Sequence, residues 1–250
     1  MKIAKLSGNA EIFHTIQGEG KSSGLPCIFL RLSLCNLHCT WCDTDYTWNW
    51  EGTPFSHVND TQPGYKKFSK EEQILEAGIE YLLEEISKFN CPNLVVTGGE
   101  PLMQQKDLAV LLQALREEKI IEHIEIETNG TLMPIADLDL QVDQYNVSPK
   151  LTNSGNPDKL RIRPEILDWF ARSPKANFKF VCAAPKDLYE IEELIRSFGI
   201  PSNKVILMPL GTSIDSLDER EKWLTEICKN KGFRFSDRMH IRLFGNKRGV

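Results

Sequence analysis

Residues 34–43 read Leu34-Cys-Asn-Leu-His-Cys-Thr-Trp-Cys-Asp43 and directly follow a predicted strand at 27–34. Their three cysteines have the spacing C-x3-C-x2-C, and thiolates this close together converge on one metal ion or cluster. A structural zinc ion takes four ligands, so His38 or Cys27 would have to complete a zinc site. An iron–sulfur cube is normally held by four thiolates, and three would leave one iron open to an exogenous ligand, as catalysis requires.

A second motif, Val95-Val-Thr-Gly-Gly-Glu-Pro101, ends another predicted strand some 55 residues after the cysteines. Gly98 and Gly99 allow the backbone to approach a ligand closely, and Glu100 can pair with a cationic amine. Ligands of α/β sheets bind outside the carboxyl ends of the strands, which is where this motif falls. On its own, the motif is also compatible with an ordinary turn.

The composition is that of an ordinary globular protein, with 250 residues, 41% hydrophobic and 26% charged, and a net charge of −5. No apolar run approaches the roughly 20 residues that cross a bilayer. The first residues lack the apolar region of a signal peptide, so we expect a cytoplasmic protein without a disulfide framework. Residues 229–250 hold seven basic residues and one acid, which predicts a solvated end or a local site for one anionic group. This excess is too small for a bulk nucleic-acid binder.

Apolar, β-branched runs alternate with segments of helical periodicity along the chain. Strands are predicted at 27–34, 93–97, 123–127, 145–148, 177–181, 204–208 and 238–243. Helices are predicted over 75–89, 108–115, 188–198 and 223–227, the first and last after the capping boxes Ser69 with Glu72 and Ser216 with Glu219. This order predicts a mostly parallel sheet with helices packed outside. Seven strands are too few for a complete eight-fold barrel, so we predict a single α/β domain, residues 1–250, built as an open or partial barrel.

One segment, residues 46–68, interrupts the alternation as an aromatic-rich insertion with six aromatic residues between Gly and Pro breakers. A connection of this length is functional or forms a small subdomain, unless its aromatic side chains only cover the core.

Polar residues also occur at unusual places near the N-terminus and in the strands. The run Thr15-Ile-Gln-Gly-Glu-Gly20 predicts a loop on which Gln17 and Glu19 are exposed. Arg31 lies in the middle of an apolar strand, and a buried guanidinium is costly without an anionic partner. An internal ion pair with Glu127 would provide one, and an anionic group of a substrate is the alternative.

The cysteine spacing, followed by the Gly-Gly-Glu-Pro motif, resembles the radical S-adenosylmethionine enzymes. The resemblance implies a partial (β/α) barrel with a [4Fe–4S] cluster on Cys35, Cys39 and Cys42. It also implies that the methionyl amine and carboxylate of S-adenosylmethionine chelate the fourth iron. One electron would then cleave the sulfonium to methionine and a 5′-deoxyadenosyl radical.

Four further stretches narrow the resemblance to the family of 7-carboxy-7-deazaguanine synthases: residues 11–20, 42–44 (Cys-Asp-Thr), 148–150 (Ser-Pro-Lys) and 244–250. This family converts 6-carboxy-5,6,7,8-tetrahydropterin to 7-carboxy-7-deazaguanine with loss of ammonia, in queuosine and 7-deazapurine biosynthesis. The radical abstracts hydrogen from C6 of the pterin, the ring contracts, and S-adenosylmethionine is regenerated. The resemblance further implies Mg²⁺ and a homodimer. For the insertion of residues 46–68, one role to consider is the docking of a one-electron reductant such as flavodoxin.

Carried over by position, the resemblance implies three groups of site residues. The pterin would contact Ile16, Gln17, Gly18, Glu19, Arg31, Thr97, Glu127 and His240. S-adenosylmethionine would contact Trp41, Asp43, Gly98, Gly99, Glu100, Ser148, Pro149, Lys150, Met208, Pro209, Leu210 and Gly211. The hydroxyl of Thr44 would bind Mg²⁺, a hard cation that prefers oxygen ligands.

Two other functions remain open at this point. An activase of a glycyl-radical enzyme would use the same cluster, but it would not need Gln17, Thr44 or the basic tail. A zinc-binding interaction module would use the three cysteines with His38.

Overall fold

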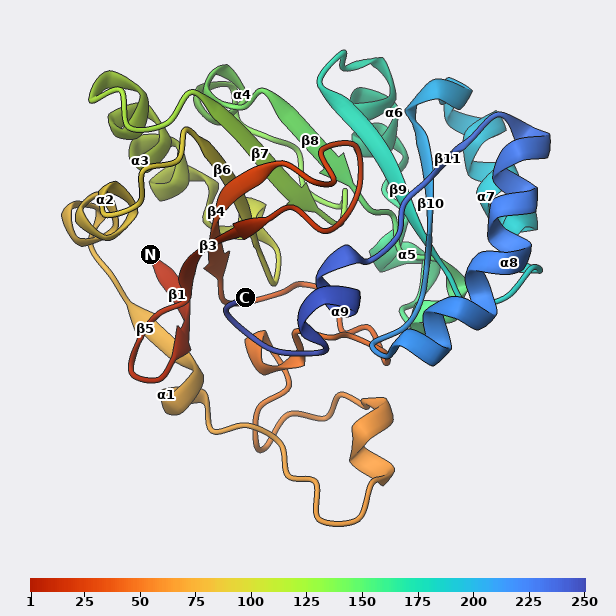
Figure 1. The fold of residues 1–250 in the computed structure, drawn as a ribbon, viewed down its shortest axis with the longest axis horizontal. Coiled ribbons are helices and arrows are strands. Elements are labelled where there is room, and N and C mark those ends of the chain that lie inside the picture. The colour runs from red at the N-terminus through yellow and green to blue at the C-terminus, as the bar shows by residue number, and fades with distance from the viewer.

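A computed structural model describes residues 1–250, and its centre is one sheet of eleven strands (Figure 1). The strands follow one another across the sheet in the order β11-β10-β9-β8-β7-β6-β4-β1-β2, with β3 paired to β4 and β5 paired to β1. Their bounds are β1 Lys2–Leu6, β2 Asn9–Ala10, β3 Ile12–Ile16, β4 Pro26–Leu32, β5 Ile74–Glu76, β6 Asn93–Gly98, β7 His123–Thr128, β8 Gln144–Val147, β9 Ala176–Cys182, β10 Val205–Pro209 and β11 Arg234–Phe235.

Seven strands, β4 and β6 to β11, pair in parallel, whereas the N-terminal strands and β5 pair antiparallel at one edge. The sheet ends at β11 on one side and at β2 on the other, so it does not close on itself. The structure therefore confirms the predicted partial (β/α) barrel, with an antiparallel extension that the sequence analysis did not predict.

The α-helices are α1 Lys70–Gln73, α2 Ile79–Ser87, α3 Gln105–Glu117, α4 Ala136–Gln141, α5 Asp158–Arg161, α6 Pro164–Arg172, α7 Asp187–Phe198, α8 Ile214–Lys231 and α9 Met239–Phe244. Short 3-10 turns are η1 Asp45–Thr47, η2 Val58–Thr61, η3 Pro101–Gln104, η4 Thr152–Ser154 and η5 Ser202–Lys204. In Figure 1 the larger helices lie around the outside of the sheet, whereas α9 lies near the middle of the view beside the C-terminus. None of these helices combines the length and the apolar character that crossing a membrane requires.

Along each parallel strand, successive side chains point alternately to an apolar and to a polar face of the sheet. On β4, Ile28, Leu30 and Leu32 are fully buried in the core, and Arg31 points to the other face of the sheet because side chains alternate along a strand. The core-facing residues of the next strands are Leu94 and Val96, Ile124 and Ile126, Tyr145 and Val147, Phe178 and Phe180, and Val205 and Leu207. The opposite face carries polar side chains, among them Glu127, Asn146 and Lys179. One face of the sheet therefore supports the helices, and the other is available for a polar site.

The predicted strand at 238–243 is wrong, because this segment forms helix α9. Strand β11 is instead the two-residue segment Arg234–Phe235, which already pairs with β10 and ends the sheet. The apolar residues of the tail pack as one turn and a half of helix, with Ile241 buried.

Both predicted capping boxes are also wrong. The Ser69 side chain makes no cap and donates to Glu71 instead. The helix expected over 75–89 begins only at Ile79, because residues 74–76 form β5. Residues 74–76 pair with β1, which gives the edge strand a partner that the local periodicity does not reveal. Helix α8 is capped three residues earlier than predicted, by Ser213, whose hydroxyl accepts from the backbone N–H of Ser216.

A matched pair of leucine substitutions tests the placement of the core. Leu94 on β6 is fully buried, whereas Leu140 on α4 is 77% exposed. We expect Leu94→Ala to lower the free energy of unfolding by about 2–5 kcal/mol, and Leu140→Ala to change it by less than about 0.5 kcal/mol. Urea unfolding followed by circular dichroism measures both values. Similar losses for the two variants would contradict the burial assigned to β6.

Candidate active site

A cavity of about 400 Å³ lies on the polar face of the sheet. Strands β3, β4, β6, β7, β9 and β10 contribute to its wall, together with the loop of residues 35–42 that carries the cysteines, called here the cysteine loop. The lining includes the predicted residues Ile16, Gln17, Gly18, Glu19, Arg31, Cys35, Cys39, Trp41, Cys42, Asp43, Thr44, Thr97, Gly98, Gly99, Glu127, Ser148, Lys150, Met208, Pro209, Leu210 and His240. Residues from eight separate segments of the chain thus meet in one place.

Three predicted residues, Glu100, Pro149 and Gly211, do not line the cavity. Glu100 is fully buried, and its carboxylate accepts hydrogen bonds from the hydroxyl of Thr128 at 2.9 Å and from the backbone N–H groups of Asn129 at 2.7 Å and Leu102 at 3.0 Å. In the structure, Glu100 therefore ties the end of β6 to the end of β7.

Gly98 and Gly99 are required by the approach of β6 to the cysteine loop. A Cβ atom on Gly99 would lie 1.9 Å from the carbonyl oxygen of Leu34, and one on Gly98 would lie 2.0 Å from that of Leu32. Gly98 also has a φ of +127°, which side-chain-bearing residues rarely adopt. These two glycines therefore position the first cysteine directly against the end of a neighbouring strand.

Of the three thiol-bearing residues of the cysteine loop, Cys39 is buried, and Cys35 and Cys42 are half-buried. Burial raises the pKa of Cys42 to about 12 and also raises the pKa values of Cys35 and Cys39. Polar groups surround the sulfur atoms: the Asn156 amide nitrogen lies 3.3 Å from Cys39 Sγ, and the Thr44 hydroxyl lies 3.5 Å from Cys42 Sγ. Buried thiols with hydrogen-bond donors beside them are suited to become thiolates when a cationic centre binds.

The residues around the thiols fit an iron–sulfur cluster better than a single zinc ion. The indole N–H of Trp48 is buried without a hydrogen-bond partner in the protein, and it is close enough to Cys42 to oppose the rise of the thiol pKa. Such a donor can serve the sulfur atoms of a cluster. No three His, Cys, Asp or Glu side chains converge in a way that would hold one metal ion. His38 stacks on Phe55 with ring centroids 3.3 Å apart, and Cys27 is buried on β4 outside the cavity lining.

In the lining of the same cavity, a buried lysine joins two carboxylates. The Lys179 amine lies 2.7 Å from Glu19 Oε2 and 2.9 Å from Glu127 Oε2, and its side chain is 6% exposed. Burial alone would raise the pKa of Glu19, but Lys179 and Arg238 hold it well below its usual range. Burial raises the pKa of Glu127 in spite of Lys179. The two carboxylates therefore differ in how readily they take a proton.

The expected exposure of Gln17 and Glu19 is wrong. Gln17 is 3% exposed, and its amide nitrogen lies 3.4 Å from Glu127 Oε1. Glu19 is held by Lys179 and, through Oε1 at 2.9 Å, by Arg238. Both side chains turn inward because the cations that neutralise the acid lie on the inner face of the sheet and on the tail.

Lys179 and Arg238 were missed by the sequence analysis. Arg238 contacts Asp43 as well as Glu19, and it donates to the carbonyl of Gly211 at 2.6 Å. The sequence does contain a signal for Lys179, because this cation lies between Phe178 and Phe180 in an apolar strand, just as Arg31 lies between two leucines. The sequence contains no such signal for Arg238, because its partners are far away in the chain and meet it only in the folded protein.

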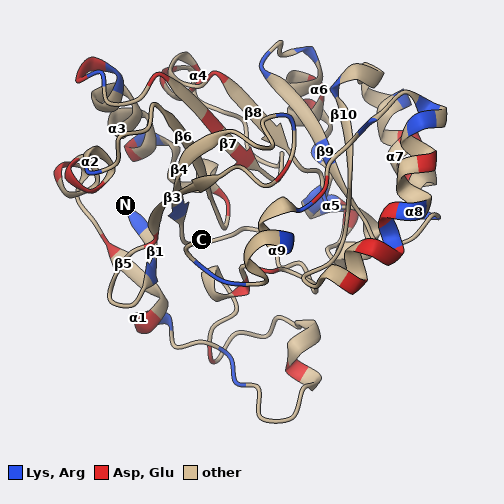
Figure 2. Ribbon diagram, in the orientation of Figure 1, with Lys and Arg blue, Asp and Glu red and all other residues tan.

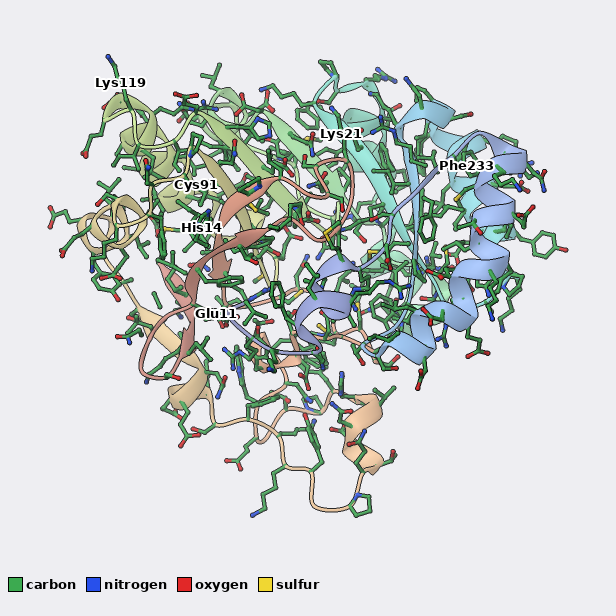
Figure 3. The ribbon with its side chains drawn as sticks, viewed as in Figure 1. Glu11, His14, Lys21, Cys91, Lys119 and Phe233 are labelled. Atoms are coloured by element: carbon green, nitrogen blue, oxygen red, sulfur yellow. The ribbon has the colours of Figure 1, made fainter.

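The partner of Arg31 is Glu11 and not Glu127. Arg31 Nε donates to Glu11 Oε1 at 2.9 Å, and Tyr46 donates to the same oxygen at 3.1 Å. Glu11, labelled in Figure 3, also accepts a hydrogen bond from Arg248 through Oε2 at 2.7 Å. The Arg31 side chain makes no hydrogen bond other than that of Nε to Glu11, so its two terminal nitrogens are available to a ligand in the cavity.

The basic C-terminal segment covers the cavity. Residues 246–250 line it, and the ribbon between α9 and the C-terminus carries Lys and Arg in Figure 2. His240 lies directly against Gly18, where a Cβ atom would be 2.4 Å from its ring, and burial lowers the pKa of His240. The guanidinium of Arg248 lies 3.5 Å from the ring centre of Tyr46. The tail is therefore part of the site and not a solvated end.

Comparison with known proteins agrees with this geometry. Residues 31–224 match the family model described as the Radical SAM superfamily. The fold and the cysteine loop thus define a radical S-adenosylmethionine enzyme, and membership of this superfamily brings a [4Fe–4S] cluster and S-adenosylmethionine as cofactors.

Two relatives are 7-carboxy-7-deazaguanine synthases. The protein from Pyrobaculum aerophilum is 35% identical over 241 residues, which cover 96% of this chain and 95% of the relative. The protein from Rhodopirellula baltica is 35% identical over 255 residues, covering 96% and 88%. The crystal structure of QueE from Escherichia coli superposes with a TM-score of 0.66 at 27% identity and covers 92% of each chain. The chain belongs to the 7-carboxy-7-deazaguanine synthase family.

Replacing Lys179 tests its role between the two carboxylates. We expect Lys179→Met to lower the free energy of unfolding by about 3–5 kcal/mol near neutral pH, because two buried acids lose their shared cation. The lowered pKa of Glu19 stabilises the fold above the pKa of this acid in the unfolded chain, and that contribution is lost as the pH falls through the folded value. The amount by which the variant is less stable than wild type should therefore shrink as the pH falls from neutral to below about 4.5, the ordinary pKa of a glutamate.

Urea unfolding of the wild type and of Lys179→Met, near neutral pH and below about pH 4.5, measures this difference in stability. Lys229→Met is the matched control, because the pair of Lys229 with Glu226 is 68% and 61% exposed. Lys229→Met should lower the free energy of unfolding by less than about 0.5 kcal/mol at either pH. A small loss of unfolding free energy in Lys179→Met, or a loss that grows on acidification, would contradict the buried pairing.

Proposed function

We propose that this protein converts 6-carboxy-5,6,7,8-tetrahydropterin to 7-carboxy-7-deazaguanine with loss of ammonia, in queuosine or other 7-deazapurine biosynthesis. The observation that carries the proposal is the shared cavity, which is lined by the cysteine loop, by Arg31 and by the group formed by Glu19, Lys179 and Glu127. Membership of the synthase family supports the same reaction.

The cysteine loop would hold the cofactors through Cys35, Cys39 and Cys42. When bound, the cluster and S-adenosylmethionine supply a 5′-deoxyadenosyl radical. The polar wall beside the loop suits the methionyl and ribose groups: the amine of Lys150 donates to Ser148 Oγ at 3.0 Å and lies 5.8 Å from the ring centre of Trp41. A lysine amine can act there as a point charge for a carboxylate or a ribose oxygen.

The opposite wall would bind the pterin. Arg31 has a fork of two free nitrogens, which matches the carboxylate of the substrate. Gln17, Glu127 and Thr97 present acceptors and donors to the amide and amino edge of the ring. Closure of the cavity by the tail would keep water away from a reactive radical.

The unequal carboxylates suit the loss of ammonia. This step delivers a proton to the departing amino group and removes one from the ring carbon beside it. Glu127, whose pKa is raised by burial, can hold or pass a proton while Glu19 stays ionised. Lys179 would orient both.

Four further features belong to the same proposal. The hydroxyl of Thr44 would bind Mg²⁺, which takes oxygen ligands and keeps several waters or substrate oxygens. A reductant such as flavodoxin would deliver the electron to the cluster. The protein would act in the cytoplasm as a homodimer. Residues 1–250 would form a single domain, as the one continuous sheet supports.

The decisive experiment is an anaerobic assay of the reconstituted protein with carboxytetrahydropterin, S-adenosylmethionine, Mg²⁺ and dithionite. Formation of 7-carboxy-7-deazaguanine, identified by mass and absorbance, is the expected result. Cleavage of S-adenosylmethionine without any change in the pterin would instead favour an activase of a glycyl-radical enzyme. Colourless protein with stoichiometric zinc would favour a zinc-binding module.

The role of Arg31 can be tested with a substitution that keeps its charge. Arg31→Lys leaves a cation beside Glu11 but removes the fork of terminal nitrogens. We expect KM for carboxytetrahydropterin to rise by about 10- to 100-fold, equivalent to about 1.4–2.8 kcal/mol, with the cluster absorbance unchanged.

Steady-state kinetics of both proteins measure this change. Arg172→Lys, in a side chain 79% exposed on α6, is the control and should behave as wild type. An unchanged KM in Arg31→Lys would remove Arg31 from the substrate contacts.

A further inference from the structure

The insertion of residues 46–68 touches the cysteine loop through three residues of one short stretch, Phe55, His57 and Val58. The ring of Phe55 stacks on His38, with centroids 3.3 Å apart and planes 9° from parallel. The backbone N–H of Val58 donates to the carbonyl of Thr40 at 2.8 Å. His57 Nε2 lies 2.8 Å from the carbonyl oxygen of Cys42. The contacts fall on alternate residues of the loop, 38, 40 and 42, so the insertion follows the loop along its length.

Residues outside the insertion hold the other side of the cysteine loop. Thr40 donates its backbone N–H to Ser154 at 2.9 Å, and His38 donates its own to Asn156 Oδ1 at 2.9 Å. Gly155 packs so closely that a Cβ atom would lie 2.7 Å from Thr40 Cγ2. The loop is therefore sandwiched between residues 153–156 and residues 55–58.

Of these three contacts, only that of His57 is made to a cysteine, and the hydrogen bonds of the His57 ring define its direction. Nδ1 accepts the backbone N–H of Asn59 at 3.2 Å, so in this pattern the ring proton is on Nε2. Nε2 therefore donates to the carbonyl of Cys42, which has no other partner in the protein. The His57 side chain is 2% exposed, and Asp60 accepts its backbone N–H at 2.8 Å.

The insertion is braced internally, so it can act as a support. Its two ends are joined by the backbone bonds from Glu51 N–H to Phe68 O at 3.0 Å and from Phe68 N–H to Asn49 O at 3.2 Å. Inside it, the hydroxyl of Tyr65 donates to the buried carboxylate of Asp45 at 2.9 Å. In Figure 1 the ribbon of the insertion extends below the sheet.

We propose that residues 55–58 form a clamp on the cysteine loop and that His57 is its main positioning residue. The clamp holds Cys39 and Cys42 in the conformation that binds the cluster, and it slows the loss of iron from the cluster. The inference rests on the cluster part of the proposed function and is independent of the pterin reaction. It also gives the insertion a function that its aromatic composition alone does not indicate.

His57 is also the N-cap of η2, through the bond that its Nδ1 accepts from Asn59. Two substitutions of His57 separate the clamp from this cap. In His57→Gln the amide nitrogen can take the place of Nε2 and still donate to Cys42. In His57→Asn the amide oxygen can take the place of Nδ1 and still accept from Asn59, but nothing reaches Cys42. Val58→Ala is the matched control, because its side chain is 54% exposed and only its backbone touches the loop.

The first measurement is the rate of iron release from the reconstituted protein to an excess of an iron chelator, followed by loss of the cluster absorbance. We expect release at least fivefold faster in His57→Asn, and within twofold of wild type in His57→Gln and Val58→Ala. Equal acceleration in the Asn and Gln variants would show that the cap of η2 matters and would overturn the clamp. Wild-type rates in both variants would overturn it as well.

The second measurement needs no cluster. Amide hydrogen exchange over residues 38–42 of the metal-free protein should be faster in His57→Asn and unchanged in His57→Gln. If wild-type protein failed to take up iron, the cluster assignment would be wrong, while hydrogen exchange would still decide whether the clamp exists. Exchange in His57→Asn that matches wild type would overturn the clamp even if the cluster were present.

Discussion

Side chains on a strand alternate between its two faces, and this constraint organises the whole protein. In the parallel strands the residues of one face are aliphatic or aromatic and pack beneath the helices, as Leu30 and Leu94 do. The residues of the other face include Arg31, Glu127 and Lys179, which could not be buried in the core without great cost. Because the sheet curves but does not close, these polar residues surround a cavity instead of facing bulk water.

Burying charge on that inner face requires that each ion find a partner. Glu11 is shared by Arg31 and Arg248, and Lys179 is shared by Glu19 and Glu127. Buried pairs add little net stability, but removing one partner is expensive, so they constrain where each side chain can lie. The pairs thereby fix the N-terminal loop and the C-terminal tail over the same cavity. The same chemistry that satisfies the charges also assembles the site.

The sequence predicted the local patterns well and the long-range partners poorly. The strands β4 and β6 to β10 have strong apolar, β-branched runs, and these predictions are confirmed by the partial barrel. The tail was predicted as a strand and is α9, since six residues of mixed polarity suit either structure and only the packing against Gly18 decides. Arg31 was recognised as needing a carboxylate, but Glu11, its actual partner, is contributed by the loop between β2 and β3. The inward position of Glu19 depends on Lys179, which is 160 residues away.

The sequence by itself determined the cluster motif, the strand order along the chain and the family, because each depends on the type and spacing of residues that are near in sequence. Only the tertiary structure decided which charges pair, that the tail covers the cavity, and that the insertion contacts the cysteine loop through His57. These features join segments far apart in the chain. A hydrogen bond or ion pair depends on atoms a few ångströms apart in space, and no local pattern records that distance.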